Sequence, residues 1–185
     1  MLQFYAYCRL QLNRIDVKLC YFFDDVRRHH GWDQVVLKKV AQYGPYFFFI
    51  LMAVLLAGGP FIPFSFSYRM KGVIVAIASA TMTKVVIDPI ARIFTRQRPF
   101  VTLPIRPLIE KDGTDPSFPS NHAGGAFALA VALSLYFPSL LWLFFFLALL
   151  VSFSRLYAGV HYLTDLIAGA ILGGGVAFGI CIFLF

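Results

Sequence analysis

Apolar segments long enough to cross a lipid bilayer dominate this sequence. They run approximately over residues 45–66, 72–94, 122–137, 139–154 and 163–185. A helix needs about 20 mostly apolar residues to span about 30 Å of hydrocarbon. Because 59% of the 185 residues are hydrophobic and only 14% are charged, an ordinary water-soluble domain is excluded. We therefore predict an all-α integral membrane bundle with about five transmembrane helices.

The first 43 residues have a different composition, because charged residues are interspersed among aromatic ones. Seven of them are basic and four are acidic. This mixture is typical of amphipathic helices that lie in the membrane interface. Within one domain of 185 residues, we predict an interfacial N-terminal segment (1–43) and a transmembrane catalytic bundle (44–185). The N-terminal segment is expected to shape a lateral entrance for lipid.

Small residues are concentrated in the last apolar segment. They are Gly169, Ala170, Gly173, Gly174, Gly175 and Gly179. Small side chains let helices approach closely in a medium that provides no hydrophobic drive for their association. We predict that this segment is a helix packed within the bundle.

The predicted crossings place three polar segments on one face of the membrane. Residues 1–43, 95–121 and 154–162 are each separated from the next by two crossings. The distribution of Lys and Arg does not identify this face, because the opposite side carries little beyond Arg69 and Lys71. The net charge of +7 is attributed to contact with anionic lipids rather than nucleic acid, since no basic stripe carries exposed aromatics. No obligate protein partner is predicted.

Two of these polar segments contain residues suited to phosphoryl chemistry. Arg98 and Arg155 carry guanidinium groups, which bind phosphate oxygens in pairs and remain charged at any working pH. His161 and Asp165 are four residues apart, so on a helix the carboxylate could hold one ring nitrogen and leave the other to attack phosphorus. His122 follows Ser120 at a predicted helix start, which favours an anion and positions the imidazole to protonate a leaving oxygen.

In these motifs the chain resembles the type 2 phosphatidic acid phosphatase family, whose fold is shared with vanadium haloperoxidases. That family has a Lys, six intervening residues and then Arg-Pro, followed later by Pro-Ser-Gly-His, and later still by Ser-Arg, five residues, His, three residues and Asp. The third signature is complete here, as Ser154-Arg155, His161 and Asp165. The resemblance implies that His161 is the nucleophile, Asp165 its orienting carboxylate and His122 the general acid.

The resemblance also implies a set of phosphate-binding residues, with two departures from the family pattern. Asn121 stands where the family has Gly, and Ala91 stands where it has Lys. Asn tolerates left-handed backbone conformations, so Asn121 is retained, and Arg92 is predicted to replace the missing Lys, with Lys84 as a competitor. The predicted phosphate-binding residues are Arg98, Arg155, Ser120, Asn121 and Arg92.

Each motif also has an ordinary structural interpretation when taken alone. Arginines at helix ends extend their charged groups into lipid headgroups, and His161 with Tyr162 would suit an interfacial anchor. Lys84 and Asp88 are more often a structural pair than catalysts. His122, His161 and Asp165 could in principle hold zinc, but no second close-spaced ligand set accompanies them, so neither a metal nor a cofactor is predicted.

These observations together predict a metal-independent membrane lipid phosphatase that acts through a phosphohistidine. The resemblance implies undecaprenyl diphosphate, phosphatidylglycerol phosphate, phosphatidic acid or lipid A 1-phosphate as the substrate. It also implies a multi-pass protein of the inner membrane with an extracytoplasmic active site. Two alternatives remain open, a lipid phosphotransferase that uses the same phosphohistidine and a phospholipid transporter or flippase.

Overall fold

The computed structural model describes residues 2–29, 32–58 and 63–184 and contains no strand within them. Its elements are α1 (Leu2–His29), α2 (Trp32–Ala57), α3 (Phe66–Phe94), α4 (Pro99–Thr102), α5 (Asn121–Tyr136), η2 (Pro138–Leu140), α6 (Leu141–Tyr157) and α7 (Leu163–Leu184). The predicted all-α class is therefore confirmed.

Four segments of the described chain are long and apolar enough to cross a membrane. They are Gln34–Ala57, Phe66–Thr102, Pro138–Tyr157 and Leu163–Leu184. The remaining predicted crossing, residues 122–137, corresponds to α5, which has 16 residues. At about 1.5 Å per residue it is about 24 Å long, shorter than a typical crossing helix. The chain is a multi-pass membrane protein.

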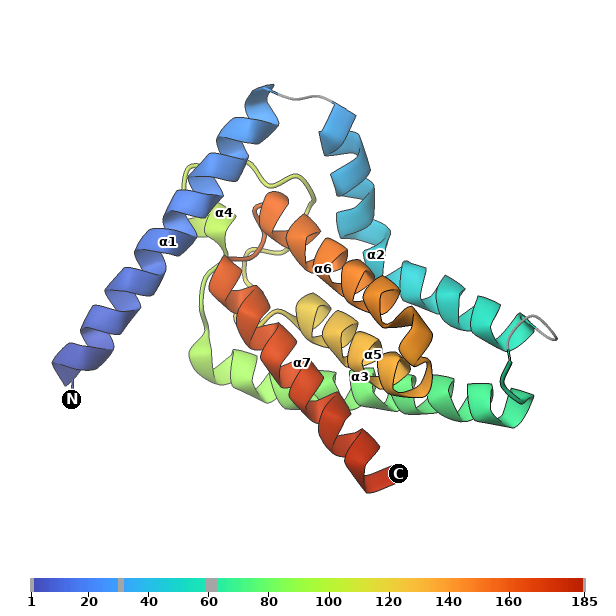
Figure 1. Ribbon diagram of the computed structural model, residues 1–185. Helices are drawn as coiled ribbons and strands as arrows, with labels where there is room; N and C mark the ends of the chain where they lie inside the picture. Colours follow the sequence, from blue (N-terminus) through green and yellow to red (C-terminus); the bar gives the residue numbers. More distant parts are fainter. Residues whose placement is uncertain (1, 30–31, 59–62, 185) are drawn as a thin grey trace.

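The first crossing begins earlier in the chain than the apolar segment 45–66 predicts. α2 starts at Trp32 and ends at Ala57, so residues on both sides of position 43 belong to one helix. Lys38 and Lys39 interrupt the apolar pattern there, but both side chains are exposed while Val40 is buried. α2 also contains Pro45, which lacks the N–H of a regular helix, and its ribbon changes direction partway along (Figure 1).

α5 is the central helix of the bundle, with α3, α6 and α7 packed against it (Figure 1). It is rich in alanine, and Ala128, Ala130 and Ala132 are fully buried. Two of the predicted small residues of α7, Gly169 and Gly173, allow close backbone approaches to α5, whereas Gly175 and Gly179 have open space beside them. A side chain at Gly173 would collide with the backbone of Gly124, and one at Gly169 would meet the carbonyl oxygen of Ser120.

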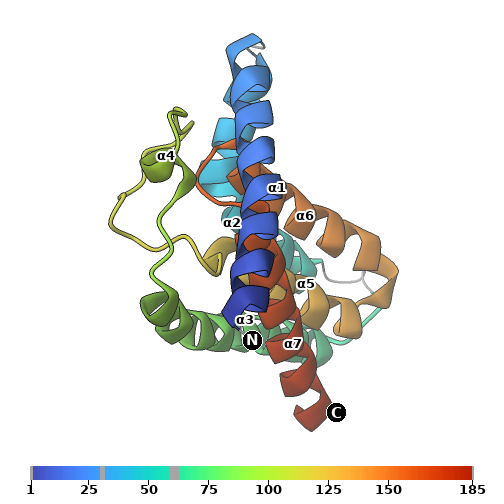
Figure 2. The same cartoon turned by 90° about the vertical axis from the view of Figure 1, so that its left-hand side faces the viewer.

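α1 lies outside this bundle, alongside the loops that connect its helices (Figures 1 and 2). It contacts both α6 and α7. Among residues 14–29, whose side chains are described, Asp16, Cys20, Asp24 and Arg27 are buried, whereas Ile15, Tyr21 and Phe22 are exposed. This part of α1 therefore turns several polar groups toward the protein, with Phe23 packed beside them against Phe153 and Tyr157.

Candidate active site

His161 lies in the loop between α6 and α7. The loop turns at Gly159, whose φ of +71° lies in the left-handed region that glycine adopts readily. In the buried ring of His161, Nδ1 is 2.8 Å from the carbonyl oxygen of Ser117, and Nε2 is 3.2 Å from Nη1 of Arg98. Because a carbonyl oxygen only accepts hydrogen bonds, Nδ1 carries the proton and Nε2 keeps its lone pair. Nε2 is the nitrogen that can act as a nucleophile.

Burial and nearby charges keep the His161 ring neutral. Burial lowers the pKa of His161 below its ordinary value, although the carboxylate of Asp165 acts in the opposite direction. The positive charge of Arg98 also disfavours a second proton on the ring. A neutral imidazole is the form that attacks an electrophile, so this environment is suited to nucleophilic catalysis near neutral pH.

Asp165 does not make the direct hydrogen bond to His161 that the sequence spacing predicts. Its Oδ2 lies 3.7 Å from Nδ1 of His161, beyond hydrogen-bond distance, and it accepts instead from the backbone N–H of Tyr162 at 2.9 Å. Its Oδ1 is 2.6 Å from Nη1 of Arg96. Since Ser117 is the hydrogen-bond partner of the ring, Asp165 acts on His161 through its charge and through the loop backbone.

Arg98 is held by backbone oxygens on both sides of the nucleophile. Nη1 donates to the carbonyl of Val160 at 3.0 Å, Nε donates to the carbonyl of Asp115 at 3.1 Å and Nη2 donates to that of Pro116 at 3.3 Å. These bonds fix a guanidinium group directly beside Nε2 of His161. Arg98 can therefore bind a phosphate oxygen at the position where phosphorus would be attacked.

The start of α5 brings three of the predicted residues to the same region. Ser120 is the N-cap of α5, and its Oγ accepts from the backbone N–H of Ala123 at 3.4 Å. The side-chain amide of Asn121 donates to Asp88 at 2.8 Å. The side chains of Ser120 and Asn121 thus have protein partners, and an anion would be bound here by the backbone N–H groups at the helix N-terminus. His122 is the second residue of α5, and its side chain is half-buried.

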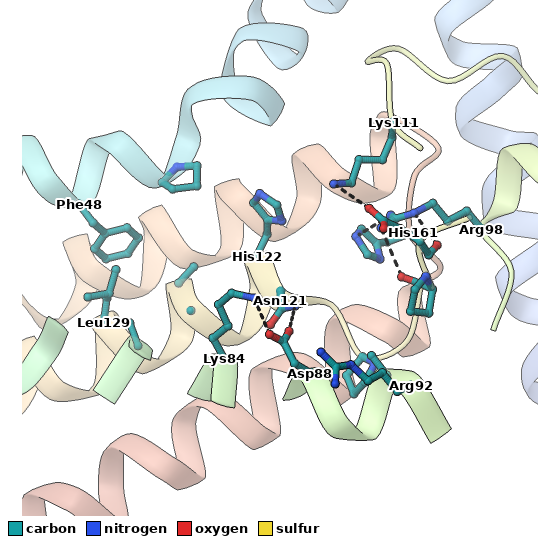
Figure 3. A pocket seen from close by; sticks show the side chains of 18 of the residues that line it. Phe48, Lys84, Asp88, Arg92, Arg98, Lys111, Asn121, His122, Leu129 and His161 are labelled. Carbon is teal, nitrogen blue, oxygen red and sulfur yellow. Dashed lines mark hydrogen bonds and ion pairs between the residues drawn. The ribbon is translucent and has the colours of Figure 1, made fainter. Parts of the chain in front are cut away.

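Two cavities meet at this region. The first, called the mixed cavity, has a volume of about 630 Å³ and is bordered by Phe48 and Leu129 at one end and by Arg98 and His161 at the other (Figure 3). The second, called the polar cavity, has a volume of about 640 Å³. It is lined by Lys38, Ala41, Gln42, Pro107, Leu108, Ile109, Glu110, Lys111, His122 and Arg155. His122 and Lys111 border both cavities.

Arg155 joins the site from the end of α6. Its side chain is buried, and among the described residues its Nε has no hydrogen-bond partner. A buried guanidinium nitrogen without a partner is energetically costly unless a ligand or water satisfies it. Arg155 also lines the polar cavity, so its guanidinium group borders a space that an anion could occupy.

Arg92 and Lys84, the two predicted substitutes for the missing motif Lys, both line the mixed cavity from α3. Arg92 is exposed. Lys84 is 2.6 Å from the carboxylate of Asp88, which also accepts from Asn121 (Figure 3). The structure brings His161, Arg98 and His122 together around the mixed cavity, and His122 and Arg155 together around the polar cavity.

Several residues that support the site were not predicted from the sequence. Arg96 lies between two buried carboxylates, at 2.7 Å from Asp16 and 2.6 Å from Asp165. Asp16 also accepts from the backbone and side chain of Thr164. The guanidinium of Arg96 stacks over the ring of Tyr162 at 4.0 Å. In the sequence, only the position of Arg96 two residues before the motif Arg98 points to a role in the site. No sequence pattern points to such a role for Asp16.

Comparisons with known proteins identify similar sequences and folds. A sequence profile of the PAP2 superfamily matches residues 70–185. The chain is 27% identical over 165 residues to the bacitracin transport permease protein BcrC of Bacillus licheniformis, covering 89% of this chain and 78% of that protein. It is 33% identical over 112 residues to an undecaprenyl-diphosphatase of Sulfolobus acidocaldarius, covering 60% of this chain and only 54% of that protein.

The solved structure of a PAP2 type phosphatase has a similar fold. It is a transmembrane PAP2 type phosphatidylglycerolphosphate phosphatase from Bacillus subtilis, with a TM-score of 0.66 over 98% of this chain and 94% of the other, at 22% identity. Residues 70–185, which the profile matches, contain Arg98, His122, Arg155 and His161 but exclude α1 and α2. With the profile match over more than half of its length, this chain belongs to the PAP2 superfamily of membrane phosphatases.

Proposed function

We propose that this lipid phosphatase forms a phosphohistidine on Nε2 of His161. The main supporting observation is the 3.2 Å approach of Arg98 to Nε2 in a buried, neutral ring whose Nδ1 is held by a carbonyl oxygen. A phosphoryl group carries negative charge on its non-bridging oxygens and needs such cations beside the attacking atom. Asp165 is proposed to keep the loop and the ring in place.

The proposed reaction has two steps. In the first, Nε2 of His161 forms a bond to phosphorus while the bond from phosphorus to the leaving oxygen breaks. His122, whose protonated form is favoured once the negative charge of the phosphate is bound beside it, gives its proton to that oxygen, which belongs to a lipid alkoxide or a lipid monophosphate. In the second, His122 accepts a proton from water as the water oxygen attacks phosphorus, and the phosphorus–nitrogen bond breaks to release inorganic phosphate.

Arg98 and Arg155 are proposed to bind the phosphoryl oxygens during both steps. Ser120 and Asn121 are proposed to contribute through the helix N-terminus, because their side chains already have protein partners. Arg92 remains a candidate for contact with the part of the substrate nearest α3, since it lines the same cavity as Arg98.

The shape and lining of the mixed cavity support a lipid as the substrate. One end is bordered by Phe48 and Leu129, and the other by charged groups (Figure 3). An amphiphile with an apolar tail and a phosphate head matches this polarity. The Sulfolobus relative is named an undecaprenyl-diphosphatase, so undecaprenyl diphosphate is the first substrate to test. Phosphatidylglycerol phosphate, phosphatidic acid and lipid A 1-phosphate follow.

We further propose that the protein lies in the inner membrane with its active site on the extracytoplasmic face. A cysteine introduced at Gly113, in the loop beside the site, would be reached by a membrane-impermeant thiol reagent in intact cells. Labelling only after the membrane is opened would place the site on the cytoplasmic face and reject this orientation.

A panel of purified lipid phosphates tests the proposed activity. The wild-type protein should release inorganic phosphate from at least one of them, and His161→Ala should lower that rate at least ~100-fold, because the nucleophile is removed. His29→Ala is a suitable control, since the side chain of His29 is 69% exposed. Loss of activity in both variants, or in neither, would contradict the role of His161.

The same assay separates two other functions. A phosphotransferase would release little phosphate from a single purified lipid and would instead move the phosphoryl group to an added acceptor lipid. A transporter is a second candidate because the Bacillus licheniformis relative is named a permease. Lipid movement across vesicles that persists in His161→Ala would favour transport.

A further inference from the structure

Lys111 occupies a position that the motifs do not account for. It lies in the loop between α4 and α5, and it is a lining residue of both the mixed cavity and the polar cavity. Figure 3 shows its side chain directed toward Arg98 and His161. Its charge also acts on the imidazole of His122. Lys111 therefore lies among the groups that would surround a phosphoryl group.

The two cations of α3 are placed less favourably. Lys84 makes an ion pair of 2.6 Å with Asp88, and 66% of its side chain is exposed. Arg92 is exposed at the edge of the mixed cavity, and neither residue lines the polar cavity. Either could contact an anion in the mixed cavity only. An anion bound between Arg98 and Arg155, which border different cavities, is better reached from the point where the cavities meet.

The local contacts of Lys111 leave its ammonium group able to bind an anion. Its Nζ is 3.4 Å from the carboxylate of Asp115, a distance too long for a strong charge-assisted hydrogen bond. The side chain of Lys111 is 34% exposed and that of Asp115 is 52% exposed, so water weakens their attraction. A phosphate group with two negative charges would compete well with this single carboxylate.

We infer that Lys111 is the third phosphate-binding cation of this site, together with Arg98 and Arg155. It would supply from the loop before α5 the positive charge that Ala91 cannot supply from α3. Three cations then match the three non-bridging oxygens of a transferring phosphoryl group. This inference rests on the proposed phosphatase function.

The test compares phosphate release and phosphate binding in single variants of the full-length protein in detergent. Lys111→Ala should lower kcat/KM by about tenfold to hundredfold, the range expected when one preorganised cation is lost. Lys111→Arg keeps the charge and should retain most of the activity. The binding constant for inorganic phosphate, measured by calorimetry, should weaken at least tenfold in Lys111→Ala.

Lys39→Ala is the matched control, because Lys39 is an exposed lysine that lines neither cavity. Arg92→Ala and Lys84→Ala are measured in parallel and should lose less than Lys111→Ala. The inference is overturned if Lys111→Ala stays within twofold of wild type in both measurements, or if an α3 variant loses more. A wild-type protein that binds inorganic phosphate through Lys111 but releases none from any lipid would reject the proposed function and leave the binding role standing.

Discussion

The guanidinium of Arg96 lies 2.6 Å from the carboxylate of Asp165, much closer than the ring of His161 at 3.7 Å. Asp165 is fully buried, and its backbone carbonyl also accepts from the N–H of Ser120 at 3.0 Å. The predicted orienting carboxylate is thus a connecting residue, which links the loop of His161 to the start of α5. Arg96 offsets part of its charge and fixes its position.

Replacing Arg96 by Ala should destabilise the protein strongly. The substitution leaves Asp16 and Asp165, both fully buried, without their shared cation. Removing one partner of a buried ion pair typically lowers the free energy of unfolding by about 3–5 kcal/mol. Thermal unfolding in detergent measures the loss, and Arg92→Ala on the exposed end of α3 is the control. Similar unfolding temperatures for both variants would show that the Arg96 cluster contributes little.

Deleting residues 1–25 should impair turnover of a soluble phosphate ester as much as turnover of a lipid. This outcome differs from that expected of a segment that only shapes a lipid entrance. The deletion removes Asp16, which holds Arg96 and Thr164, and Asp24, which pairs with Arg27 at 2.8 Å. Asp16 supports the start of α7 through Thr164, and Asp24 positions Arg27, whose guanidinium donates to the carbonyl oxygens of Tyr157 and Arg106 beside the loops around His161. If the deletion left full activity on the soluble ester and reduced only the turnover of lipid, the N-terminal segment would instead serve to shape the lateral entrance for lipid.

The convergence of the motifs could be predicted because the ends of a helix that crosses a membrane lie at the two membrane surfaces. Arg98 and His161 lie 63 residues apart in sequence, yet both fall at span ends on one face, and the structure places them 3.2 Å apart. A helix length and a crossing count suffice for this prediction. The N-cap at Ser120 follows from local sequence in the same way.

The finer contacts could not be predicted, because they depend on irregular backbone and on distant polar pairs. The bond from His161 to the carbonyl of Ser117 is made in a loop without periodicity. The pair Asp16–Arg96 joins residues 80 positions apart and leaves no pattern in the sequence. The start of α2 was missed because exposed Lys38 and Lys39 resemble an interfacial segment, although the helix continues through them.

Phosphate release should continue unchanged in an excess of a metal chelator. The proposed cations of the site are side chains, Arg98 and Arg155, and the proposed nucleophile is a neutral imidazole that needs no metal-bound water. The measurement is the initial rate before and after prolonged incubation with EDTA. A rate that falls and then recovers on addition of Mg²⁺ or Zn²⁺ would contradict a metal-independent reaction.

Acidification should destabilise the protein partly through His161. Its pKa in the folded state is lowered by burial, whereas the unfolded chain keeps a value near the ordinary 6.5. The unfolded state therefore binds more protons below pH 6.5, and this contribution to stability is complete above 6.5 and falls as the pH falls. Each pH unit in that window accounts for up to about 1.4 kcal/mol. Unfolding between pH 7.5 and 5 should shift more in wild type than in His161→Asn, and equal shifts would contradict the assignment.

Two glycines of α7 should differ in their tolerance of the same substitution. A side chain at Gly173 would collide with the backbone of Gly124, which cannot move without displacing α5 and the adjacent His122. Overpacking of this kind typically lowers stability by about 1–3 kcal/mol, and more where backbone atoms collide. Gly175 lies two residues further on with open space beside it. Gly173→Leu should therefore lower the unfolding temperature and the rate of phosphate release, whereas Gly175→Leu should leave both near wild type. Equal tolerance at both positions would show that α5 and α7 are not in the close contact that aligns the two loops of the active site.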